Sequence, residues 1–322
     1  MAGFSNRTGY IGIGKQTAKG TGVVPTKFIK WAGGTKLSPE MAFTRYREGG
    51  DTVFPGISLK ETHAPDGNFP LLARPDIAGF LFAMWAGKDL VSGTGPYSHA
   101  ITPDVDPPWL SIERSVAAQI IDRIVDAKIR SIEVTGEAGK PPRLAVAFNG
   151  ITTAKQATGA TTTYETDMPW VFFQGTYTLD GVVTAVIESF RATFVNEFDT
   201  DDYTNQVVRD DLILMNRDVT LEWVMKLVDA AQYFKVYNGA SANLVPANAL
   251  TEGAFIADLT YGTGAALRDL KLEVPLIAHE VAAAELETGG GRLRYECKAH
   301  AKKGTGALAT ITVQNSTTLA YV

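Results

Sequence analysis

The sequence presents one order of segments twice, once before and once after about residue 165. In the first half, an apolar run over residues 74–87 has the length of a short helix and ends in glycine, and residues 226–239 repeat this in the second half. A long stretch with the pattern of two strands follows each run, over residues 128–150 and 268–301. Two copies of one β-rich unit favour a building block of a ring over a protein with a single active site.

Composition narrows the class of protein further. The chain has 322 residues, enough for two domains, and a formal net charge of -5 with acidic and basic residues interspersed. Because no basic stripe is present, tight binding to nucleic acid is excluded. The single cysteine, Cys297, rules out an intrachain disulfide framework and indicates a strand residue in a protein assembled in a reducing compartment. The longest apolar run, residues 77–87, is too short to cross a bilayer, and the N-terminus lacks the apolar region of a signal peptide.

Alternation of apolar and polar residues predicts a mainly β fold. It is clearest over residues 219–227, where Val219, Leu221, Trp223, Met225 and Leu227 would face a core. Thr220, Glu222 and Lys226 share the opposite face with Val224, which predicts a sheet with one wet face. We expect two tandem β-sandwich or half-barrel domains, each with a short flanking helix. Their predicted bounds are residues 27–165 and 166–322, after an extended, unpacked N-terminal arm at residues 1–26.

The pairing of the later strands follows from the turns between them. Residues 137–142 carry Gly139 and a Pro-Pro pair, so residues 143–148 should return antiparallel to 128–134. In the second half, residues 270–274 should pair across a wide turn with residues 292–299. Residues 48–68, rich in Gly and Pro, are predicted to form a long loop or hairpin, and the acidic segment 197–211 is predicted to be a loop.

Chemical motifs in the sequence each have a simpler structural explanation. Residues 9–16 (GYIGIGKQ) nearly match a phosphate-binding loop, but Gln16 replaces the final hydroxyl residue and no helix follows before Pro25. The acidic pairs, such as Asp201-Asp202, lack the ligand spacing and central glycine of a calcium loop, and no nucleophile elbow is present. The sequence therefore predicts no enzyme, no cofactor and no metal site.

The histidines and tryptophans also receive structural interpretations. The four histidines, His63, His99, His279 and His300, lie far apart, which favours solvated or interface side chains over a zinc site. Four tryptophans recur in apolar runs and are predicted to lie in the core: Trp85, Trp109, Trp170 and Trp223.

The order of strands and turns resembles the tail tube proteins of long-tailed (siphovirus-type) bacteriophages. The residues that carry the resemblance are 121–129 with 134–140 in the first half, and 270–275 with the closing strand 312–316 in the second. The resemblance covers about residues 28–316. It implies stacked rings around a channel for DNA, with a trimer of two-unit chains giving a six-fold wall. It also implies a virion protein assembled in the host cytoplasm, with other tail proteins as partners at the tube ends and no membrane partner.

The resemblance also suggests roles for particular residues. Thr220, Glu222 and Lys226 are candidates for the channel lining, which we expect to be modestly acidic so that DNA slides through without specific binding. Candidates for contacts between rings are Gly50, Asp51, His63, Asp201 and Asp202. Two other classes fit the composition: a head-decoration or other β-rich virion protein, and a β-sandwich binding module.

Overall fold

A computed structural model describes residues 9–37, 40–46, 57–184, 186–228, 230–283 and 293–322. As predicted, the fold is mainly β, with a large antiparallel sheet and, in the described residues, two α-helices. The first-half elements are β1 (Tyr10–Lys15), β2 (Lys27–Ile29), β3 (Glu40–Tyr46), β4 (Ile57–Ala64), β5 (Gly67–Leu72), α1 (Pro75–Ala86), β6 (Gly87–Ser92), β7 (Tyr97–Pro103), β8 (Leu110–Val116), β9 (Ile120–Glu137), β10 (Arg143–Asn149) and β11 (Thr152–Lys155). The second-half elements are η2 (Phe172–Gln174), β12 (Gly175–Leu179), β13 (Val182–Thr184), β14 (Ile187–Asp199), β15 (Ile213–Lys226), α2 (Ala231–Asn238), β16 (Glu252–Tyr261), η3 (Gly264–Ala266), β17 (Arg268–Ala283), β18 (Arg294–Ala301) and β19 (Thr310–Asn315).

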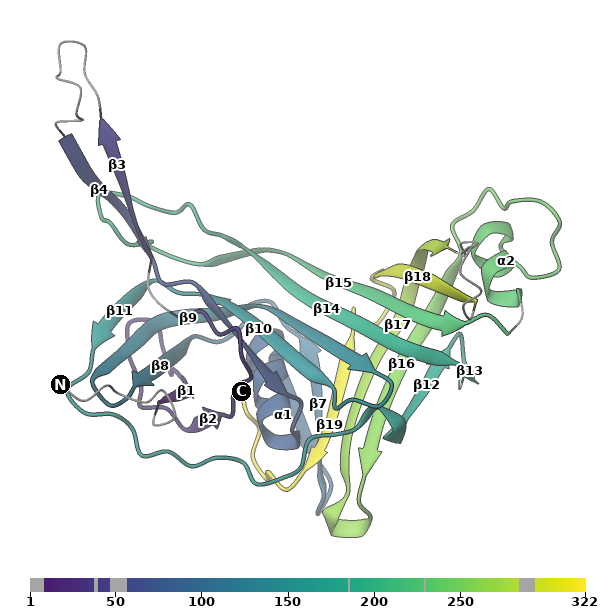
Figure 1. Ribbon diagram of the computed structural model, residues 1–322, viewed down its shortest axis with the longest axis horizontal. Helices are drawn as coiled ribbons and strands as arrows, with labels where there is room; N and C mark the ends of the chain where they lie inside the picture. The colour runs from purple at the N-terminus through teal and green to yellow at the C-terminus, as the bar shows by residue number, and fades with distance from the viewer. Residues whose placement is uncertain (1–8, 38–39, 47–56, 185, 229, 284–292) are drawn as a thin grey trace.

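The long strand β9 belongs to two parts of the sheet. Its first part pairs with β8 and β11, and β8 continues the sheet through β1 to β2. Its second part pairs with β10 on one side and with β14 on the other. Between the two parts, Asp126 has a φ of 59°, a left-handed conformation that interrupts the regular strand. β9 therefore carries the sheet from one layer of the first half into a layer shared with the second half (Figure 1).

The two halves of the chain meet along two pairs of strands. One pair is β9 with β14, and β14 continues the sheet through β15 and β18 to β17. The other pair is β19 with β7, so the last strand of the chain extends a sheet edge of the first half. A hydrophobic core runs across both junctions and includes residues from Ile11 to Tyr321. The domain boundary near residue 165 stays a prediction.

Helix α1 lies inside the curled sheet (Figure 1). Pro75 occupies its first turn, and Gly87, with a φ of 95°, ends it in the left-handed conformation, as the sequence predicts. The helix packs against β7, β9 and β19. Gly79 allows the C-terminal Tyr321 to approach, because a Cβ there would lie 2.9 Å from the tyrosine ring. The apolar run 75–86 is therefore a core element.

Two sequence-based predictions of secondary structure and pairing need correction. Residues 10–15 are a buried strand, β1, between β2 and β8, and not part of an unpacked arm. Gly12 is needed there for packing, because a Cβ would lie 2.6 Å from the Pro25 side chain. Residues 269–273 pair with β19, whereas β18 pairs with residues 277–283 further along β17.

Candidate functional site

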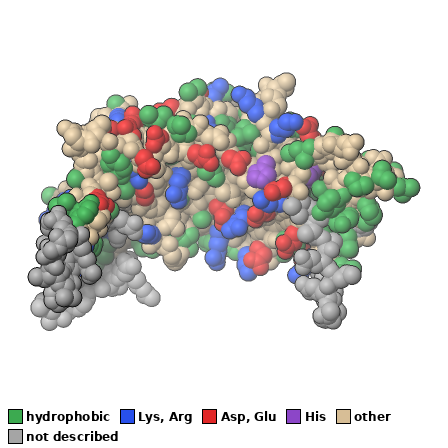
Figure 2. All heavy atoms as spheres, turned by 90° about the horizontal axis from the view of Figure 1, so that it is seen from above, with side chains coloured by type: hydrophobic (Ala, Val, Ile, Leu, Met, Phe, Trp, Pro, Cys, Tyr) green, Lys and Arg blue, Asp and Glu red, His purple; other side chains and the backbone are tan. Residues whose placement is uncertain are grey.

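A polar face runs across β9, β14, β15 and β18, the strands that join the two halves. Because side chains alternate along each strand, Phe190, Trp223 and Cys297 point into the core and their neighbours point outward. Thr220, Glu222 and Lys226 lie on the outward face as the sequence predicted, and all three are half-buried. Figure 2 views the molecule from this side and shows acidic and basic side chains mixed along its middle.

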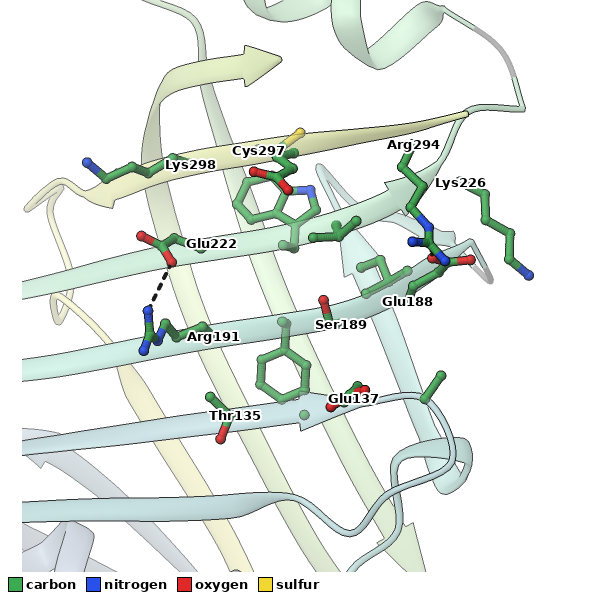
Figure 3. Close-up of a pocket in the computed structure, with 17 residues that line it drawn as sticks. Thr135, Glu137, Glu188, Ser189, Arg191, Glu222, Lys226, Arg294, Cys297 and Lys298 are labelled. Atoms are coloured by element: carbon green, nitrogen blue, oxygen red, sulfur yellow. Dashed lines mark ion pairs between the residues drawn. The ribbon is translucent and has the colours of Figure 1, made fainter. Parts of the chain in front are cut away.

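Strand register places charges of opposite sign next to each other. Arg191 on β14 lies opposite Glu222 on β15, and Glu222 lies opposite Lys298 on β18. The Arg191 guanidinium is 3.0 Å from Glu133. It is also 3.6 Å from Glu222, the pair marked in Figure 3. The nearby Glu133 carboxylate raises the pKa of Arg191, with Glu222 adding to the effect. Arg191 therefore joins acidic side chains from β9 and β15, one from each half.

The polar face is hollowed into a groove of about 1040 Å³. The charged side chains that line it are Glu137, Glu188, Arg191, Glu222, Lys226, Arg294, Glu296 and Lys298. Four are acidic and four are basic, so the groove is balanced in charge and differs from the acidic surface that we expected. Figure 3 shows these side chains on adjacent strands.

Most of the basic side chains in the groove are paired with carboxylates. Arg294 lies 2.6 Å from Glu188, and Lys298 lies 2.8 Å from Glu280 at the edge of the face. With Arg191, three of the four groove cations have an acidic partner. Such exposed pairs contribute little to stability, but they reduce the positive charge available to an anionic ligand. The face is therefore poorly suited to tight binding of a polyanion.

The described residues that were predicted for contacts between rings lie outside the groove lining. His63 is half-buried on β4. Its backbone N–H donates to Val207 O at 2.6 Å, which brings it beside the acidic segment. Asp201 is exposed and Asp202 is half-buried. Gly50 and Asp51 lie outside the described residues.

The acidic segment 197–211 is held against the first half of the chain. The Arg209 guanidinium donates to both Asp66 carboxylate oxygens, at 2.7 and 2.8 Å, and also contacts Gly150 O. Arg209 holds the pKa of Asp66 below its usual range, despite the opposing effect of burial on that carboxyl. Lys19 also lies 3.3 Å from Asp211. The segment thus has a fixed course between β14 and β15, which its loop-like sequence did not indicate.

Other predicted sites take structural roles. Residues 10–15 of the near-match to a phosphate-binding loop form β1, so they make no loop around a phosphate. His99 and His279 are buried, contrary to the expectation of solvated or interface histidines, and His279 packs edge-on against Trp223. Trp85, Trp170 and Trp223 lie in the core as predicted, while Trp109 is half-buried.

Two kinds of feature are absent from the described part of the chain. Its histidine, cysteine and carboxylate side chains form no group of three that could hold a metal ion. No helix there has the length and hydrophobicity to cross a membrane.

Sequence reasoning placed Glu222 on the polar face but did not identify its partners. The pattern of residues 188–196 is that of a strand, so alternation could have placed Arg191 on a polar face. It could not have shown that β9 and β15 flank β14, because strand neighbours are set by contacts distant in sequence.

Comparison with known proteins identifies a family. The model of the family described as phage tail tube protein matches residues 6–308, nearly the whole chain. None of the curated proteins searched matches it.

Proposed function

Because this chain belongs to the phage tail tube protein family, we propose that its copies form rings of three and that the polar groove lines the channel. Membership of the family makes the protein a structural component of the virion tail, assembled in the host cytoplasm. The family is a structural one, and its members assemble with themselves and with other tail proteins. The three-fold ring, the channel lining and the handling of DNA are the proposed refinements.

One observation carries the channel assignment, namely the polar face that crosses the junction between the halves. Through β10, β9, β14, β15 and β18, both halves contribute to one sheet with a hydrophobic side and a hollowed, charged side. A hollowed polar sheet face suits the inner wall of a water-filled tube. If each half occupies one sixth of the wall, three chains complete a ring.

The charge pattern of the groove supports passage of DNA without binding. Proteins hold DNA chiefly through Lys and Arg side chains that neutralise phosphates. In the groove, Arg191, Arg294 and Lys298 are each paired with a carboxylate of the same chain. A phosphate would have to compete with these carboxylates for each cation. A balanced, ion-paired wall therefore serves sliding as well as the acidic wall that we first expected.

Contacts between stacked rings form the second part of the proposal. His63 lies where β4 meets the segment after β14, and Asp201 and Asp202 belong to that segment. None of the three lines the groove, so we assign them to such contacts. Gly50 and Asp51 belong to the same proposal through their place in the sequence between β3 and β4. Other tail proteins would bind at the tube ends.

Electron microscopy of the purified protein tests the ring. We expect hollow rings or tubes whose class averages show three-fold symmetry with pseudo-six-fold walls. Isolated trimers that never stack would instead favour a head-decoration protein. A monomer at high concentration would favour a β-sandwich binding module and contradict the proposal.

Charge reversal in the groove tests the channel lining. Glu222→Lys removes a partner of Arg191 and places new positive charge beside Lys298. Tubes of this variant should retain DNA at low salt and release it as salt rises. Glu273→Lys, at a half-buried β17 position outside the groove lining, is the matched control. If both variants treat DNA alike while tubes still form, the groove does not line the channel.

A further inference from the structure

Helix α2 lies at one end of the molecule and has little burial to hold it there (Figure 1). Of its eight residues, only Asn238 is buried. A helix of this length is unstable in water on its own, so its position depends on its contacts with the sheet. Tyr233 and Val236 pack against the core, and the Thr251 hydroxyl lies 3.0 Å from Lys235 O and from Val236 O. A modest change in free energy therefore suffices to shift α2 between an attached and a detached position.

An ion pair ties α2 to the turn between β12 and β13. Lys235 Nζ lies 2.5 Å from Asp180 Oδ2, and Asp180 Oδ1 accepts the Ala254 N–H at 2.9 Å. Asp180 has a φ of 53° and Gly181 a φ of 81°, and two successive left-handed residues are what a tight two-residue hairpin turn requires. The turn and the strand β16 thus fix this carboxylate beside α2.

His279 is buried next to the same carboxylate. It stands on β17, the strand that α2 contacts, and only 5% of it is exposed. Among the described residues, neither of its ring nitrogens has a hydrogen-bond partner. A Cβ at Gly253 would collide with Asp180 Oδ1 and would lie 2.9 Å from His279 Nε2. The two side chains therefore reach the same point beside the Gly253 backbone, where glycine leaves room for both.

Two charged groups act on the His279 ring, one from each neighbouring element. Burial lowers the pKa of His279 most strongly, Asp180 opposes this effect, and Lys235 of α2 adds to it. In the described chain, the residues that other strands place beside His279 are uncharged, with Trp223 on β15, Gly253 on β16 and Ala299 on β18. The next residue of β17, Glu280, is exposed and pairs with side chains of β18. The ring is therefore neutral at neutral pH while α2 is attached.

We propose that His279 is an acid-sensitive switch that controls the attachment of α2 to the sheet. Protonation creates a buried positive charge near the Lys235 ammonium, and Asp180 is the one carboxylate that both cations would share. A buried charge without a partner of its own is costly, so the protonated ring favours the detached position of α2, in which water reaches it.

The direction of the pH dependence follows from the pKa of His279. This pKa is lower when α2 is attached than when the ring is in water, where it is about 6.5. The neutral ring therefore stabilises the attached position fully above about pH 6.5. This stabilisation declines as the pH falls from 6.5 toward the lowered pKa, by up to about tenfold in the detachment equilibrium for each pH unit. The switch goes beyond the proposed function and does not depend on the ring or the channel.

Hydrogen exchange read by mass spectrometry tests the switch in the full-length protein. Exchange rates of peptides that contain α2, corrected for the intrinsic effect of pH, report how often the helix detaches. After this correction, we expect α2 to exchange at least about fivefold faster at about pH 5 than at about pH 8. Peptides from the buried helix α1 should not exchange faster at the lower pH. An α2 rate that is independent of pH would overturn the proposal.

Substitutions identify the group that responds to acid. His279→Gln keeps a polar side chain but removes the titrating ring, so the exchange of α2 should lose its dependence on pH. His300→Gln is the matched control, because His300 is exposed on the neighbouring strand β18, and it should respond as the wild type does. A wild-type response in His279→Gln would overturn the proposal.

A surface substitution keeps the test valid if His279→Gln does not fold. Lys235→Met removes the cation that competes with the protonated ring for Asp180. The ring can then pair with Asp180 while α2 stays attached, so the acceleration at about pH 5 should shrink to less than about twofold. An acceleration as large as that of the wild type would show that Lys235 and His279 do not compete, and would contradict the switch.

Discussion

The two helices occupy matching places in the repeated order of elements, yet they do different things. In α1, 11 of the 12 residues are buried, whereas in α2 only Asn238 of eight is buried. Both helices end at a glycine in the left-handed conformation, with φ values of 95° at Gly87 and 77° at Gly239. The comparison shows that two helices can share the same C-terminal stop while their environments differ completely.

The physical difference lies in what surrounds each helix. Strands β2, β6, β7, β9, β17 and β19 all contact α1, so its apolar residues have partners on every side. Helix α2 contacts β17, and only its Tyr233 and Val236 pack against the core. The other side of α2 is exposed. The sheet therefore encloses α1 as part of the core, whereas α2 lies at the surface.

The contrast predicts the largest effect in α1. Phe82 is fully buried and packs edge-on against Phe194 of the second half, with ring centroids 5.5 Å apart. Phe82→Ala should lower the free energy of unfolding by about 3–5 kcal/mol, because it removes a large buried side chain and leaves a cavity. Urea denaturation measures the change. A loss below about 1 kcal/mol would mean that α1 is not a core element.

A somewhat smaller effect is expected where α1 is tied to the second half. The buried Asn196 side chain on β14 donates to Trp85 O at the end of α1 and to Ile129 O on β9, both at 3.0 Å. Asn196→Ala leaves both carbonyls without these donors and should lower the free energy of unfolding by about 2–3 kcal/mol. Thr193→Ala, at a half-buried position on the same strand, is the control and should change stability by less than about 0.5 kcal/mol. Equal effects of the two substitutions would contradict this role.

The start of α1 should also make stability depend on pH. The Glu165 carboxylate accepts from the Asp76 and Ile77 N–H groups at 2.7 and 3.0 Å, and burial raises its pKa from 4.5 to about 7. The pKa of Glu165 is higher in the folded state than in the unfolded state. Its contribution to the free energy of unfolding is therefore complete below pH 4.5 and is lost as pH rises through 7. Glu165→Gln should flatten the fall in stability between pH 5 and 7, by on the order of 1–2 kcal/mol. Thermal melts across this range test it, and an unchanged slope in the variant would contradict it.

The smallest effect on stability is expected in α2. Phe234 is 43% exposed, so Phe234→Ala should change the free energy of unfolding by less than about 0.5 kcal/mol. Urea denaturation of this variant measures the change. A large loss of stability in this variant would contradict the difference in burial between the two helices.

Sequence reasoning worked best where a signal is local. Pro75 and Gly87 predicted both ends of α1, and alternation over residues 219–225 correctly divided buried from outward positions. It failed at β1, because a glycine-rich segment resembles a loop until the close contact of Gly12 with Pro25 is seen. It also failed on the partner of residues 270–274, because alternation along one strand does not specify which strand lies beside it.

By itself, the sequence determined the mainly β character of the protein, the glycine that ends each helix and the polar identity of the face that includes Glu222. Period-two alternation and helix-ending glycines act over a few residues, so they can be recognised without a structure. Only the tertiary structure decided that Glu133 and Glu222 both pair with Arg191. It alone also decided that α1 is buried while α2 is mostly exposed. These outcomes depend on which distant strands meet and in what register, and that is fixed by packing of the whole chain.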